Sequence, residues 1–177
     1  MPERLPWQRR IALARGWEQM LNDVMWEWKA DLTFSDDYEN ITMGRAQRMV
    51  ERWVKRLEGT EHIEVGAFYS IALRNGRLHI HALLIGRGRG ANGGRTLRDI
   101  DSKRWARAWP CRATVEVVAS NERVIHYTAG QNVKNQACEN DFYNVGLLNE
   151  ARGQPDLGPA VGGPDDPILR RHVDENS

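Results

Sequence analysis

Apolar residues recur at helical spacing in two stretches of the first third of the chain. In residues 7–29 they fall three or four positions apart, which predicts an N-terminal helix. A second amphipathic helix is predicted over residues 42–57, with its apolar side chains on one stripe and arginines opposite. Thr42 is suited to cap this helix and Gly59 to end it. Between the two helices, residues 30–34 are predicted to form a short strand.

Strand-like alternation dominates residues 65–85, and the rest of the chain is organised around them. Two apolar runs flank Asn75-Gly76, a dipeptide that favours the two positive φ angles of a type I′ turn. Because side chains alternate between the faces of a strand, His79 and His81 project from the same face, with Cα atoms about 7 Å apart. Two imidazoles at that spacing are able to converge on one metal ion. The hairpin therefore predicts a pair of metal ligands.

The remaining elements follow in order along the chain. Residues 96–109 predict a short helix stopped by Pro110, residues 112–118 a strand, and residues 121–134 a helix capped by Ser120 or Asn121. Phe142 and Tyr143 suit a final strand or turn. We therefore expect an α+β fold: an antiparallel sheet of four to five strands, helices packed mainly on one face, and the histidines on the open face. From about residue 151 glycine, proline and aspartate dominate, which predicts a disordered tail over 151–177.

Composition and charge set limits on the class of protein. At 177 residues, with 41% apolar and 28% charged residues, the chain is expected to form one main domain. It lacks an apolar run of about 18 residues and an N-terminal secretory segment, which predicts a cytoplasmic protein without a membrane span. Its two cysteines lack metal-ligand spacing and agree with a reducing compartment.

The near-zero net charge of +1 hides a basic stretch between residues 74 and 112. Within it, residues 86–95 hold five glycines and three arginines, which predicts a mobile basic loop. Two interpretations stay open for this loop: a flap over nucleic acid, or a disordered connection. On the first interpretation the candidate phosphate-binding residues are Arg77, Arg87, Arg89 and Arg95.

The helix at residues 121–134 presents a candidate nucleophile. Tyr127, Gln131 and Lys134 share one helical face, because residues at i, i+4 and i+7 lie one above another. A tyrosine hydroxyl has an ordinary pKa of about 10, so phosphoryl transfer through it requires a metal ion and a nearby cation. A histidine pair and a tyrosine on neighbouring elements are therefore a combination suited to phosphodiester chemistry.

Three segments together resemble the His-hydrophobe-His (HUH) endonucleases, in particular the initiators of rolling-circle replication. Residues 30–34 (ADLTF) are similar to the first motif of that family, residues 77–84 (RLHIHALL) to its metal-binding motif, and residues 126–134 (HYTAGQNVK) to its tyrosine motif. The resemblance implies an RRM-like sheet. It also implies a nuclease domain over residues 30–150, preceded by an N-terminal helical extension over 1–29.

The resemblance further implies a mechanism. His79 and His81 hold Mg²⁺ or Mn²⁺, Tyr127 attacks a phosphate of single-stranded or hairpin origin DNA, and Lys134 steadies the phosphate. The product is a 5′-phosphotyrosyl link and a free 3′-hydroxyl that primes replication of a plasmid or phage. A host helicase and polymerase are the implied partners, because the chain has no room for a helicase domain.

Two departures from the family pattern stand out. Gln131 occupies the place of a second tyrosine, which implies a single-tyrosine enzyme. Such an enzyme requires a second protomer or another nucleophile to terminate a round of replication. The third metal ligand of the family is a carboxylate seven to nine residues before the first histidine, where this chain has Ser70, Ile71 and Ala72. Asp31, Glu116 or Gln131 are the substitutes available, and Asp31 is the preferred one.

Two alternative functions therefore stay open. One is a catalytically idle descendant that binds nucleic acid without cutting it. The other is a transposase or relaxase of the same superfamily.

Overall fold

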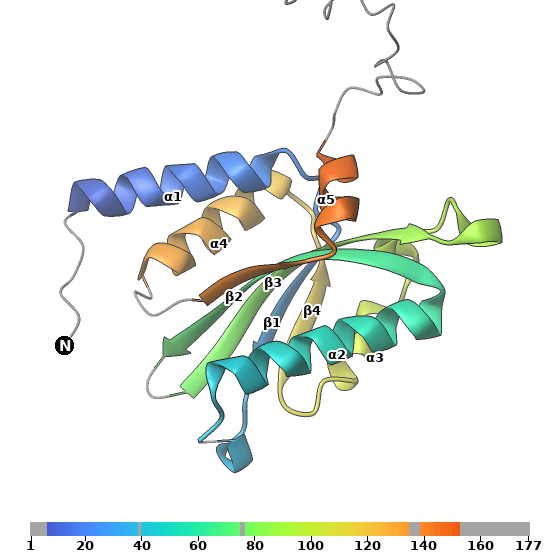
Figure 1. The fold of residues 1–177 in the computed structure, drawn as a ribbon, viewed down its shortest axis with the longest axis horizontal. Coiled ribbons are helices and arrows are strands. Elements are labelled where there is room, and N and C mark those ends of the chain that lie inside the picture. The colour runs from blue at the N-terminus through green and yellow to red at the C-terminus, as the bar shows by residue number, and fades with distance from the viewer. Residues whose placement is uncertain (1–6, 39, 75–76, 135–138, 153–177) are drawn as a thin grey trace, which may run out of the picture.

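The computed structural model describes residues 7–38, 40–74, 77–134 and 139–152. Within these ranges, five strands form one antiparallel sheet in the order β4-β1-β3-β2-β5 (Figure 1). The strands are β1 (Trp28–Thr33), β2 (Ile63–Arg74), β3 (Arg77–Gly88), β4 (Ala113–Val117) and β5 (Glu139–Tyr143). The helices are α1 (Trp7–Asn22), α2 (Met43–Glu61), α3 (Ser102–Arg107), α4 (Asn121–Lys134) and α5 (Val145–Ala151), with 3₁₀ turns η1 (Asp36–Tyr38), η2 (Gly90–Asn92) and η3 (Leu97–Asp99). The predicted α+β class, with its antiparallel sheet and N-terminal helix, is confirmed.

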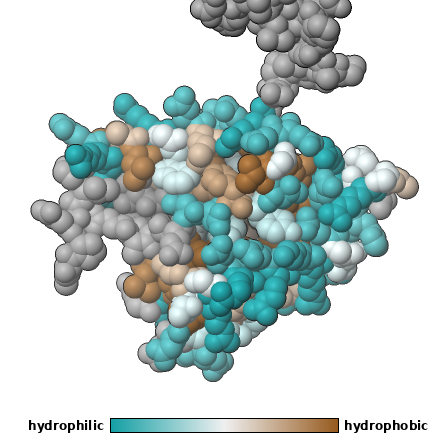
Figure 2. All heavy atoms as spheres, in the orientation of Figure 1, coloured by the Kyte–Doolittle hydropathy of each residue, from teal (hydrophilic) through white to brown (hydrophobic). Residues whose placement is uncertain are grey.

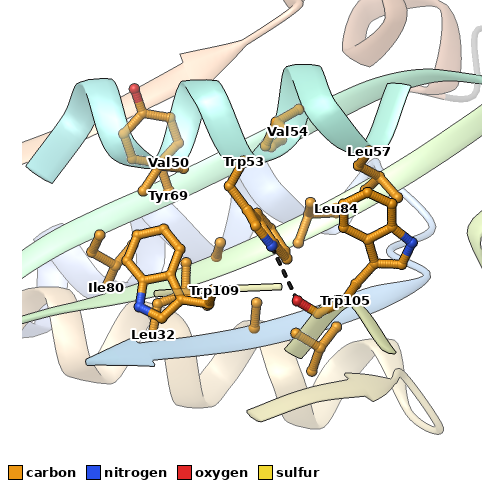
Figure 3. Close-up of a cluster of buried hydrophobic side chains, with 14 of the residues drawn as sticks. Leu32, Val50, Trp53, Val54, Leu57, Tyr69, Ile80, Leu84, Trp105 and Trp109 are labelled. Carbon is orange, nitrogen blue, oxygen red and sulfur yellow. Dashed lines mark hydrogen bonds between the residues drawn. The ribbon is translucent and has the colours of Figure 1, made fainter. Parts of the chain in front are cut away.

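The larger core lies between the sheet and α2, with α3 at its side. Val50, Trp53, Val54 and Leu57 point from α2 onto the sheet, where they meet alternate residues of the strands (Figure 3). The indole Nε1 of Trp53 donates a hydrogen bond of 3.1 Å to the carbonyl oxygen of Trp105. Thr42 caps α2 as predicted, since its side chain accepts from the backbone N–H of Arg45. The buried side chains of this face therefore pack against α2 and α3.

A second core lies on the other face, under α1, α4 and α5. Phe68, Leu83 and Ile85 of the sheet pack there against residues of all three helices. The ring of Trp17 on α1 contacts that of Phe68 at a tilt, with centroids 5.3 Å apart. More helices pack on this face than the sequence predicts, because these apolar strand residues are shielded from water only when helices lie over them. Elsewhere on this face β1 and β3 present the polar side chains of Asp31, His79 and His81, and Tyr127 of α4 meets His81 there.

Element boundaries differ from the sequence prediction in several places. α1 ends at Asn22 rather than residue 29, because Trp26 and Trp28 are buried as the chain turns into β1. α2 runs past Gly59 to Glu61 and ends at His62, which has a left-handed φ of 54°. The predicted helix over 96–109 is divided into η3 and α3, since Asp101 caps a new helix start. Of the strand or turn predicted around Phe142 and Tyr143, the structure has the strand, β5, which pairs with β2.

Two predictions fall on parts of the chain that the structure leaves undescribed. The Asn75-Gly76 turn and the tail beyond residue 152 lie outside the described residues. The hairpin register that the turn predicts is confirmed, with Ala72 opposite His79 and Ser70 opposite His81. In the part of the chain that the structure covers, no helix is long and apolar enough to cross a membrane.

Candidate functional site

The register of the three central strands brings polar side chains to one place. β3 lies between β1 and β2, and it pairs His81 with Asp31 and His79 with Thr33 on the β1 side. On the β2 side the facing residues are Ser70 and Ala72, which are small. Because side chains alternate along a strand, the residues of these pairs project from the same face of the sheet. The two histidines therefore have a carboxylate on the β1 side and two small, buried residues on the β2 side.

His81 is held in place by Asp31. Its ring Nδ1 lies 2.5 Å from Asp31 Oδ1, and only 7% of the residue is exposed. The other ring nitrogen, Nε2, is buried and has no hydrogen-bond partner among the described residues. The ring of His79 packs edge-on against that of His81, with centroids 5.0 Å apart. A carboxylate on Nδ1 fixes the orientation of an imidazole and leaves Nε2 for a ligand.

Tyr127 reaches this cluster from α4. Its ring meets that of His81 edge-on, with centroids 5.8 Å apart, and the residue is 41% exposed. The ammonium group of Lys29 lies 4.7 Å from the centroid of the Tyr127 ring and 2.9 Å from Asp31 Oδ2. Lys29 is therefore a cation in contact with the ring of the candidate nucleophile.

A groove of about 780 Å³ lies where β1 ends and β3 begins. We call it the histidine groove. Tyr127, His79, His81 and Asp31 lie along it, and two arginines, Arg77 and Arg112, contribute to its wall. Arg77 also forms an ion pair with Asp36. The groove therefore combines imidazoles, a phenol and cations in one surface that is open to solvent.

Asp31 and Lys29 stabilise each other's charged forms. Burial on its own raises the pKa of Asp31, but hydrogen bonds from His81 and Lys29, together with their charges, outweigh it, and the pKa lies below its ordinary value. Burial on its own lowers the pKa of Lys29, but the hydrogen bond to Asp31 and its negative charge reverse this, so the pKa is raised. Both groups are therefore ionised at neutral pH.

Three of the predicted nucleic-acid-binding residues do not reach this groove. Arg87 lies near the end of β3 that is far from the histidines, about 26 Å along the strand from His79, and Arg89 and Arg95 follow beyond that end. Arg87 pairs with Glu64 and Glu150, Arg89 approaches Glu58 and Glu64, and Arg95 pairs with Glu61. Gly86–Gly88 of the predicted loop belongs to β3 itself. The glycine-rich segment is thus anchored to carboxylates.

The other predicted residues lie on elements near the groove. Gln131 and Lys134 are on α4, four and seven positions beyond Tyr127, but their side chains lie outside the described part of the structure. Glu116 faces Lys29 across the β1–β4 pair, one strand further from the histidines. Lys29 and Arg112 were missed by sequence reasoning. Lys29 could have been found, because it lies two residues before Asp31 and shares its strand face, whereas nothing in the sequence marks Arg112.

The donor set fits a metal ion only in part. His79 and His81 offer two nitrogen donors on one face of the sheet, and the buried Nε2 of His81 is available to a ligand. Among the described residues, no group of three His, Cys, Asp or Glu side chains is placed to hold a metal ion. Asp31, the predicted third ligand, has its Oδ1 on Nδ1 of His81 instead. This arrangement suits a two-histidine site whose remaining positions are filled by water or phosphate oxygens.

Comparisons with known proteins add little to this description. No model of a known protein family matches the chain, and a search of curated proteins finds no significant match. Among solved structures, the chain is similar to the N-terminal nuclease domain of non-structural protein-1 from minute virus of mice. The identity is 15% and the TM-score 0.22, over 78% of this chain and 56% of that chain. That domain has a Zn²⁺ coordinated in its active-site pocket and recognises DNA at the origin of replication. At so low a TM-score the likeness carries no weight for the function of this chain.

Proposed function

We propose that this protein is an HUH-type endonuclease that nicks and rejoins single-stranded DNA through Tyr127 and so starts rolling-circle replication of a plasmid or phage. The observation that carries the proposal is the meeting of Tyr127 with a histidine pair in one groove, where His81 is fixed by Asp31. The divalent ion would be held by His79 and His81, with Mg²⁺ or Mn²⁺ as the expected metal. When bound, such an ion neutralises and polarises the scissile phosphate.

Other side chains of the protein bind the DNA and support the attack by Tyr127. Arg77 and Arg112 draw the DNA backbone into the groove by charge. The Tyr127 oxygen attacks the phosphorus atom, a P–O bond to the tyrosine forms and the P–O3′ bond breaks. The tyrosine gives up one proton to solvent, which its exposure permits, and the departing 3′-oxygen takes one up. Lys29 stabilises the negative charge that develops on the phenol oxygen, and Lys134 remains the second candidate for that role.

The expected partners follow from the chemistry. The substrate is single-stranded or hairpin origin DNA, and the free 3′-hydroxyl would be extended by a host polymerase with a host helicase opening the duplex. The same chemistry also serves a transposase or a relaxase. An idle DNA-binding descendant is the second candidate, and one observation favours it: Ser70 and Ala72 stand beside the histidines where the family pattern has a carboxylate.

Cleavage of labelled single-stranded oligonucleotides with Mn²⁺ tests the proposal. The wild type should cut, and His79→Ala and His81→Ala should each lose cleavage by at least about 10²-fold, because metal ligation is lost. His62→Asn is the matched control, since His62 lies at the end of α2 in a left-handed conformation that asparagine tolerates. DNA binding by the wild type without any cleavage would favour the idle descendant instead.

A further inference from the structure

A row of basic side chains runs along the outward side of α2, on the sheet face opposite the histidine groove. Its members are all exposed: Arg45, Arg48, Arg52, Lys55 and Arg56. At 3.6 residues per turn they fall within a sector of about 100°, on the side of the helix away from its buried residues. We call them the α2 basic row.

The row continues into a groove between α2 and α3. A hollow of about 310 Å³ there is lined by Arg56, Thr60, Arg104 and Arg107, with Trp105 and Ala108 beneath them. A neighbouring hollow of about 270 Å³ shares Arg56 and Ala108 and adds Arg52 to the wall. Three arginines thus line one hollow, which is large enough for a phosphate group. Two of them also face carboxylates, since Arg104 pairs with Glu61 and Arg107 lies 3.9 Å from Asp101. Arg56 is the member of the row among the three.

Within the described residues, the positive charge of this row is not paired with carboxylates. Among the residues that the structure describes, none of the five cations of the row forms an ion pair with a carboxylate. Arg52 donates to the carbonyl oxygen of Arg48, and Arg45 lies over the ring of Tyr38. By contrast, Arg87, Arg89 and Arg95 all face carboxylates. The side of the molecule over α2 is strongly hydrophilic (Figure 2).

The shape of the row indicates which polyanion it suits. From Arg45 to Arg56 it is straight and rigid over about 16 Å of helix. Proteins that bind single strands interleave cations with exposed aromatic rings on which bases stack. Here the nearby tryptophans, Trp53 and Trp105, are 4% and 2% exposed and belong to the core. The row therefore offers charge without a stacking platform, which suits a regular phosphate backbone.

From these observations we infer that the α2 basic row and the α2–α3 groove bind the phosphate backbone of double-stranded DNA. The choice of DNA as the polyanion rests on the proposed function. α2 and α4 lie on opposite faces of the sheet (Figure 1), and Tyr127 of α4 lines the histidine groove, so a duplex arm over α2 and a single strand in the groove occupy separate sites. The protein would then hold a junction between paired and unpaired DNA. The contacts are to the backbone, so they position the protein and carry no base specificity.

The test measures binding of a blunt-ended duplex and of a single-stranded oligonucleotide of equal length, by fluorescence anisotropy in EDTA over a range of salt concentrations. The test variant combines Arg48→Ala, Arg52→Ala and Arg56→Ala, exposed positions where alanine favours the helix. The control combines Arg9→Ala, Arg15→Ala and Arg123→Ala, which removes the same charge from exposed positions on α1 and α4.

The test variant should bind the duplex at least about tenfold more weakly than the wild type, and its salt slope should flatten by up to about 0.9 for each lost contact. Single-strand affinity should stay within about twofold, and the control should match the wild type. Equal duplex affinity of the test variant and the control would overturn the inference, as would an equal loss for both forms of DNA. If the test variant loses duplex affinity as expected but the wild type does not cleave single-stranded DNA, the proposed function fails and the inference stands.

Discussion

Asp31 on β1 and His81 on β3 are joined by a contact of 2.5 Å between Oδ1 and Nδ1. The two residues lie directly opposite each other in the β1–β3 pair, so the contact follows from strand register. It fixes the His81 ring with Nε2 buried and without a hydrogen-bond partner in the described part of the chain. Asp31 therefore acts on the proposed metal site through His81.

Replacement of Asp31 should weaken metal binding. Asp31→Ala frees the His81 ring, and loss of a carboxylate that orients a ligand histidine typically costs about 10–100-fold in metal affinity. Asp31→Asn keeps an oxygen acceptor for Nδ1–H and should lose less. Calorimetric titration with Mn²⁺ measures both variants, with Asp37→Ala as a control at an exposed position on η1. Unchanged affinity in Asp31→Ala would contradict the assigned role.

Replacement of Lys29 should slow cleavage more than it weakens DNA binding. Its ammonium group lies 4.7 Å from the Tyr127 ring centroid, so Lys29→Met removes a charge that stabilises the developing phenolate. Loss of one such stabilising group costs about 10²-fold in rate. Single-turnover cleavage separates the rate from binding, and Lys29→Arg should restore part of it. If only Lys134→Met slowed cleavage, the role would belong to the lysine on α4.

Stability should fall with rising pH in the range where Glu27 ionises. Burial raises the pKa of this carboxyl above 4.5, although the backbone N–H groups of Leu97 and Gly86 donate to it and partly offset the shift. A group whose pKa is raised on folding adds stability below its unfolded pKa, and that stability is lost as pH rises through the folded pKa. Urea unfolding between about pH 4 and 7 measures this. Glu27→Gln should flatten the profile, and an identical pH dependence in the variant would contradict the assignment.

The central hairpin was predictable because its signals are local. The alternation around Asn75-Gly76 predicts the pairing of His79 with Ala72 and of His81 with Ser70, and β2 and β3 have this register. The helix that carries Tyr127 was equally predictable, since the apolar residues of 121–134 have helical spacing and a capping residue precedes them. The Ser120 side chain indeed accepts from the N–H of Arg123.

The parts of the site that were not predicted depend on contacts between distant segments. The place of Lys29 beside Tyr127 joins residues 98 positions apart, and only the packing of α4 on the sheet determines it. The arginines of residues 86–95 were interpreted as a basic flap because their partners, such as Glu61 and Glu150, lie far away in the sequence. The α2 basic row was visible as the polar side of an amphipathic helix. Its lack of acidic partners, however, is a property of the folded chain.

The most direct test of the account is whether Tyr127 becomes covalently attached to DNA. The protein is incubated with Mn²⁺ and a labelled single-stranded oligonucleotide from its own replicon, run on a denaturing gel, and the adduct is mapped by mass spectrometry. The account predicts a labelled protein band with a 5′-phosphotyrosyl link at Tyr127 that is absent in Tyr127→Phe and retained in Tyr38→Phe. An adduct that persists in Tyr127→Phe, or cleavage by the wild type without any covalent adduct, would contradict it.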